Sequence, residues 1–65
     1  MDGLIVGRNV HYMEWSNHRA AIVTEVVDYD KGIVKVMVIK PAGTDFLQCD
    51  YSENPRPGTW HWIEK

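Results

Sequence analysis

The sequence predicts an all-β fold, and three observations lead to this prediction. Stretches rich in β-branched residues recur along the 65 residues, and clusters of turn-forming residues separate them. No stretch shows a convincing helical period. Four to five short strands in so small a chain are typical of an SH3-like barrel or a strongly coiled antiparallel sheet, here in a single domain over residues 1–65.

The first predicted strand is short. Val10–Tyr12 is β-prone and follows the turn-like entry Gly7–Asn9. The three apolar residues before it, Leu4–Val6, are too few to form more than an extended lead-in.

The next two predicted strands are longer and form a hairpin. Arg19–Val27 is rich in β-branched residues, and Ile33–Ile39 follows it. Asp28–Gly32 supplies the turn, with its glycine free to take a positive φ. The adjacent Val26–Val27 breaks the alternation and predicts a β-bulge.

The last third of the chain predicts a turn, a strand, a loop and a closing strand. Pro41–Thr44 is the turn, because proline cannot continue a central strand. Asp45–Tyr51 is the strand after it. Ser52–Gly58 is a proline-containing loop, and Thr59–Ile63 is a short aromatic strand.

Alternation along the third strand separates its two faces. Val34, Val36 and Val38 form a face without charge, which predicts that this face is buried. Met37 and Ile39 then lie on the outer face and need cover. Because a chain of this size is only marginally stable, we expect a second copy to supply that cover, and we predict at least a homodimer.

Composition narrows the class of protein. A net charge of -2 argues against a protein that binds nucleic acid through charge alone. No apolar run approaches the roughly 20 residues that span a bilayer, and no signal-like segment begins the chain. A single cysteine excludes an internal disulfide. We therefore expect a cytoplasmic protein without a membrane partner.

The most unusual stretch is Gly58–Trp62. In an extended strand Trp60 and Trp62 point to one face and His61 to the other. The two indoles can stack on a base, an aromatic ring or a peptide proline. Alternatively, one or both complete the core of the barrel. Both interpretations hold if one indole lies inside and the other lines a cleft.

Two other segments carry candidate binding residues. His18 and Arg19 precede a long apolar strand, and the guanidinium of Arg19 suits a phosphate or carboxylate. The alternative is a surface ion pair that contributes little to stability. Tyr51, Ser52 and Arg56 offer a ring, a hydroxyl and a cation for a polar anionic ligand. The alternative is an ordinary loop, because serine, proline and glycine are common in loops.

Metal ligands have no recognisable spacing. His11, His18, His61 and Cys49 are suitable ligand types, but they lie on separate segments without a paired motif. The sequence therefore predicts neither a metal site nor a cofactor.

Catalysis is not expected either. The chain has no nucleophile elbow, no phosphate-binding loop and no dinucleotide fingerprint. Cys49 with His61 could serve as nucleophile and base, but Cys49 alternates with Leu47 and Tyr51, which favours a buried and inert thiol. We therefore predict that the protein is not an enzyme.

Several strings together indicate a relationship to other proteins. Gly7–Tyr12, the R-A-A-I-V-T string of Arg19–Thr24, Tyr51–Glu53 and the G-T-W-H-W string of Gly58–Trp62 resemble a family of small uncharacterised proteins from actinobacteria and bacteriophages. The resemblance implies no catalytic residue. It does imply a binding role, because small phage proteins without catalytic apparatus often bind host proteins, nucleic acid or the nucleotide signals of bacterial immunity.

The sequence thus favours a non-catalytic binding module that sequesters a small anionic or nucleotide-like ligand, in the host cytoplasm if a phage encodes it. The alternative is an SH3-like adaptor for a host protein, a proline-rich peptide or single-stranded nucleic acid. The candidate ligand-binding residues are His18, Arg19, Tyr51, Ser52, Arg56, Trp60 and Trp62.

Overall fold

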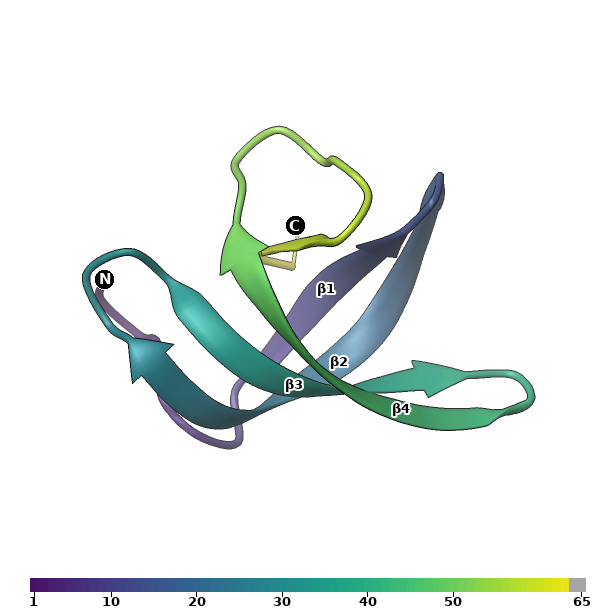
Figure 1. Ribbon diagram of the computed structural model, residues 1–65, viewed down its shortest axis with the longest axis horizontal. Helices are drawn as coiled ribbons and strands as arrows, with labels where there is room; N and C mark the ends of the chain where they lie inside the picture. Colours follow the sequence, from purple (N-terminus) through teal and green to yellow (C-terminus); the bar gives the residue numbers. More distant parts are fainter. Residues whose placement is uncertain (64–65) are drawn as a thin grey trace.

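A computed structural model describes residues 1–63, which form a closed barrel of five strands (Figure 1). The strands are β1 (Asn9–Glu14), β2 (Asn17–Asp28), β3 (Ile33–Lys40), β4 (Gly43–Tyr51) and β5 (Thr59–His61). This confirms the predicted all-β barrel. Within these 63 residues no helix has the length and apolar character needed to cross a membrane.

The barrel closes through one parallel pair of strands. Neighbours from β1 to β4 run antiparallel, and β5 runs antiparallel to β1 but parallel to β4. An odd number of strands cannot alternate in direction all the way around a closed ring. The predicted sheet was antiparallel throughout, and the β4–β5 pair corrects that detail.

Strand β2 is the longest and carries the irregularities that coil the sheet. Its register with β3 shifts between Val26 and Asp28, which confirms the predicted bulge, and also between Val23 and Glu25. Bulges increase the local twist of a strand. Two of them in one strand let a sheet of only five strands curl into a closed barrel.

The valine face of β3 forms the centre of the core, as predicted. Val34, Val36 and Val38 are completely buried, and so is the indole of Trp60 from β5. Leu4 and Cys49 add to the same cluster. The core is therefore built mainly from valines around one large aromatic ring.

The segment before β1 is more than an extended lead-in. The amide of Gly7 donates a 2.7 Å hydrogen bond to the carbonyl of Val23, and the amide of Val23 donates a 3.0 Å bond to the carbonyl of Arg8. Leu4 enters the core, whereas Ile5 and Val6 stay exposed. These bonds fix Arg8 against the wall of the barrel.

The loop over residues 52–58 returns the chain to the barrel, and it projects beyond the end of β4 as a green-to-yellow arc (Figure 1). The amide of Ser52 donates to the carbonyl of Trp60 at 3.0 Å, and the amide of Gly58 donates to the carbonyl of Met13 at 2.9 Å. The hydroxyl of Thr59 donates to the carbonyl of Arg56 at 2.6 Å. The loop is thereby anchored at both ends and places β5 between β1 and β4.

Candidate functional site

The predicted binding residues do not meet at one place. Trp60 lies in the core, where its indole has no exposed surface to offer a ligand. Tyr51 is half-buried and packs edge-to-face on Trp60, with 5.0 Å between ring centroids. Both aromatic rings therefore serve the barrel itself, which is the alternative interpretation that the sequence left open for Trp60.

Two of the polar candidates bind each other. Nε of Arg56 donates to the hydroxyl of Ser52 at 3.3 Å, and that hydroxyl donates to the carbonyl of Asn54 at 2.6 Å. Ser52 is buried, while Arg56 is exposed. These contacts order the loop over residues 52–58.

Arg19 lies at one end of the barrel in a network of ion pairs. Its Nε donates to Oε1 of Glu14 at 3.2 Å, and Nζ of Lys40 contacts the other oxygen of that carboxylate. The hydrogen bond from Lys40 lowers the pKa of the Glu14 carboxyl, and Arg19 acts in the same direction. Asp45 and then Glu14 raise the pKa of Lys40. Arg19 is therefore engaged in the ion pair that the sequence offered as its alternative role.

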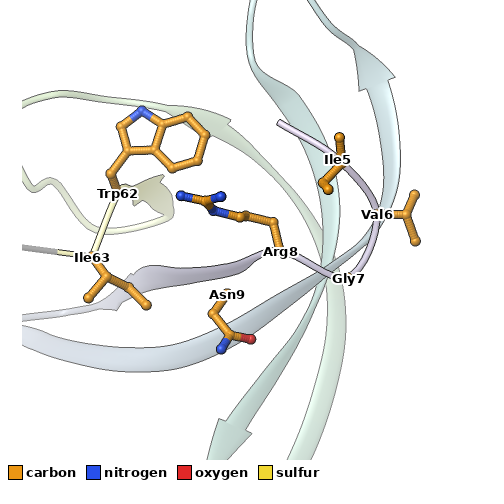
Figure 2. A pocket seen from close by; sticks show the side chains of 7 residues that line it. All are labelled: Ile5, Val6, Gly7, Arg8, Asn9, Trp62 and Ile63. Carbon is orange, nitrogen blue, oxygen red and sulfur yellow. The ribbon is translucent and has the colours of Figure 1, made fainter. Parts of the chain in front are cut away.

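Trp62 is the predicted residue that lines a cleft. It is half-buried and packs at 90° on Trp60, with the ring centroids 4.9 Å apart. The guanidinium of Arg8 lies 5.4 Å from the centroid of the Trp62 ring, as a cation–π pair (Figure 2). One indole is thus inside the barrel and the other is at its surface.

Arg8 and Trp62 belong to an open groove of about 600 Å³ on the barrel wall. Figure 2 shows the side chain of Arg8 extended beneath the indole, with Ile5 on one side and Ile63 on the other. The residues that line the groove are Ile5, Val6, Gly7, Arg8, Asn9, Trp62 and Ile63. We call this surface the Arg8–Trp62 groove.

The side chains that line the groove are mostly apolar, and their polar groups are the guanidinium of Arg8, the amide of Asn9 and the indole N–H of Trp62. None of its lining residues, all within the described part of the chain, is acidic. Among residues 1–63 no carboxylate lies within ion-pair distance of Arg8. Arg8 is not among the predicted binding residues, because nothing in the turn before β1 indicates that it will meet Trp62. That meeting depends on the pairing of β1 with β5.

The structure also brings together all three histidines of the sequence, which we call the histidine cluster: His11, His18 and His61. One possible ligand atom from each lies within 4.8 Å of the others. Nδ1 of His18 and Nε2 of His61 are 3.1 Å apart, and the three rings meet edge-to-face. The sequence predicted no such cluster, because the residues come from three strands without a regular spacing.

Cys49 lies apart from this cluster, inside the barrel. Burial raises the pKa of its thiol to about 12, with the nearby charge of Asp50 adding to the effect. The thiol therefore stays protonated at neutral pH, as an inert core residue does.

Comparisons with known proteins do not extend these observations. No family model matches the chain, and no curated protein or solved structure does. The resemblance to small actinobacterial and phage proteins therefore stays a prediction.

Proposed function

We propose that this protein is a small binding module without catalytic activity, and that it captures a small anionic or nucleotide-like ligand in the Arg8–Trp62 groove. The observation that carries the proposal is the guanidinium of Arg8, held against Trp62 in an apolar groove and without an acidic partner among residues 1–63. A cation in this setting is available to an external anion.

The geometry suits a ligand with one anionic group and one apolar or planar part. The planar guanidinium presents its N–H donors in one plane, where they can bind a phosphate or carboxylate through two hydrogen bonds. Ile5, Val6 and Ile63 offer exposed apolar surface beside it. Nucleobases stack on arginine as well as on aromatic side chains, so a nucleotide meets both requirements.

The groove is of a size that suits such a ligand. Small-molecule sites usually enclose about 300–1,000 Å³, and the groove of about 600 Å³ lies within that range. It is open rather than enclosed, which supports capture and release of a ligand rather than a reaction that must exclude water.

Calorimetry against a panel of mononucleotides, cyclic dinucleotides and ADP-ribose tests the proposal. We expect at least one member to bind at micromolar concentration and Arg8→Gln to weaken its binding about tenfold or more, since a charge-assisted hydrogen-bond pair contributes about 1.5–3 kcal/mol. Trp62→Leu should also weaken binding, by removing the ring that supports the guanidinium.

Arg56→Gln is the matched control, because it removes the same charge from the loop over residues 52–58. We expect it to leave the affinity unchanged. Loss of binding in Arg56→Gln but not in Arg8→Gln would move the site to the loop. A panel without any binder, combined with a stoichiometric protein or RNA partner from a host lysate, would replace the proposal with the adaptor alternative.

A further inference from the structure

From the histidine cluster we infer a metal site: His11, His18 and His61 bind one divalent transition-metal ion, with zinc as its natural occupant. This inference is independent of the Arg8–Trp62 groove. It depends on the strand order, the separation of the nitrogen atoms and the surroundings of His11.

The strand order places the three imidazoles on one outer face of the barrel. His11 lies in β1, between β2 and β5, and is directly opposite His61 of β5. His18 of β2 is opposite Met13, two residues along from His11 and on the same face of β1. Side chains at directly opposite and diagonal positions of neighbouring strands are within reach of each other.

The nitrogen separations suit a tetrahedral ion. With Zn–N distances of about 2.0–2.1 Å, two nitrogens on one zinc lie about 3.3 Å apart. Nδ1 of His18 and Nε2 of His61 are 3.1 Å apart, and the three candidate atoms all lie within 4.8 Å of one another. His18 is exposed, so its side chain is free to rotate by the small amount that brings the set together.

A hydrogen bond between two of the rings explains only part of the arrangement. His18 and His61 can share a proton across their 3.1 Å contact. The Nδ1 atom of His11, however, is buried and has no hydrogen-bond partner among residues 1–63. Buried polar atoms are rarely left without a partner, so a third imidazole with an unpaired nitrogen calls for a further partner. A metal ion among the three rings supplies one once the His11 ring presents that nitrogen to it.

The ligand chemistry selects the class of metal. Neutral imidazoles bind zinc, cobalt, nickel and copper, whereas magnesium and calcium require oxygen ligands. No carboxylate of the described residues belongs to the cluster, and Cys49 lies inside the barrel. Three nitrogen ligands leave one position of a tetrahedral ion unfilled. Because His18 is exposed, that fourth position is open to water or an anion.

Metal binding would also hold the barrel closed. Strand β5 has three residues and pairs with β1 at His11 and Tyr12. An ion bound by His61, His11 and His18 links β5 to β1 and β2 through side chains as well as backbone. Small domains commonly gain stability from such a metal link.

Zinc titration of the purified chain by calorimetry, with cobalt(II) absorption as a second readout, tests the site. We expect one ion per chain at micromolar affinity or tighter, and intense visible bands of a four-coordinate cobalt ion. Zinc should raise the thermal unfolding midpoint, and a chelator should return it to the starting value. His18→Asn and His11→Gln should each weaken zinc binding about tenfold or more.

His18→Asn is the variant that decides, because His18 is exposed and its replacement does not disturb the core. Glu25→Gln, which removes an exposed carboxylate from the same strand, is the control and should bind zinc like the unaltered chain. Absence of zinc binding would overturn the inference, as would histidine variants that bind zinc as tightly as the unaltered chain does. One ion per two chains would show a site shared between copies and would overturn it too.

Discussion

The indole nitrogen of Trp60 donates a 2.7 Å hydrogen bond to the backbone carbonyl of Gly32, 28 residues earlier in the chain. Both residues are buried. The bond joins the strand that closes the barrel to the turn between β2 and β3, beside which the N-terminus also lies (Figure 1). It satisfies the one polar atom of the Trp60 side chain, which otherwise could not be buried without cost.

Replacement of Trp60 by phenylalanine tests this bond. Trp60→Phe leaves the carbonyl of Gly32 without its donor and opens space in the core, so we expect a loss of about 2 kcal/mol or more in the free energy of unfolding. Urea unfolding followed by circular dichroism measures the change. Trp15→Phe is the control, because Trp15 is 79% exposed, and it should shift stability by no more than about 0.5 kcal/mol.

Gly32 should resist substitution for two separate reasons. Its φ is +73°, and a Cβ there would lie 2.7 Å from Cβ of Tyr51. We expect Gly32→Ala to cost about 1–3 kcal/mol through strain alone and more through the clash. Gly58→Ala separates the two effects, because Gly58 has φ +84° but nothing near its Cβ position. Equal losses in the two variants, measured by urea unfolding, would show that the clash contributes nothing.

The ion pairs of Glu14 predict a specific loss of stability in acid. Because Lys40 and Arg19 lower the pKa of Glu14 below its usual 4.5, the folded state holds this carboxylate ionised more readily than the unfolded state does. The contribution of the ionised Glu14 to the free energy of unfolding is therefore fully present above pH 4.5. It is lost as the pH falls through the lower pKa that Glu14 has in the folded state.

Urea unfolding midpoints across the acid range test that prediction. Glu14→Gln should make stability fall less steeply with decreasing pH than in the unaltered chain. Glu53→Gln, in the exposed loop, removes one carboxylate without touching Lys40 or Arg19 and is the matched control. An acid slope that Glu14→Gln leaves unchanged would contradict the assignment.

The outer face of β3 and β4 predicts self-association. Ile39 is 44% exposed and Phe46 is 73% exposed, and Phe46 lies directly opposite Met37. We expect a homodimer that buries this face, seen by light scattering at tens of micromolar. Met37→Glu should give a monomer of about 7.5 kDa with an unchanged β-sheet circular dichroism signal. Asn54→Asp adds one negative charge in the exposed loop over residues 52–58 instead of on this face and should remain dimeric, whereas an unaltered chain that is already monomeric would refute the dimer.

The elements that the sequence predicts well are those that depend on local periodicity. Alternation alone identified Val34, Val36 and Val38 as the buried face, because a strand repeats every two residues wherever it lies. The same alternation predicted that the side chains of His61 and Trp60 point to opposite faces of β5. Strand β5 ends at His61, but Trp62 still packs against Trp60 and the core cluster, on the side that alternation predicts.

The candidate sites depend instead on which strands become neighbours. His18 and His61 are 43 residues apart in sequence and 3.1 Å apart in space. The β1–β2 and β1–β5 pairs and their registers bring them together, and the β1–β5 pair also brings Arg8 to Trp62. No pattern within a single strand carries that information, so the sequence placed Arg19 rather than Arg8 in the site.

Closure by β5 also predicts an order of folding. The strands from β1 to β4 are joined by short turns and can pair as they emerge during synthesis, whereas β5 must find β1 across most of the chain. Until it does, the largest core side chain is missing and the edges of β1 and β4 are unpaired. Unpaired edges bind other unpaired edges. We therefore expect docking of residues 59–61 to be both the late, slow step of folding and the step that ends the chain's tendency to aggregate.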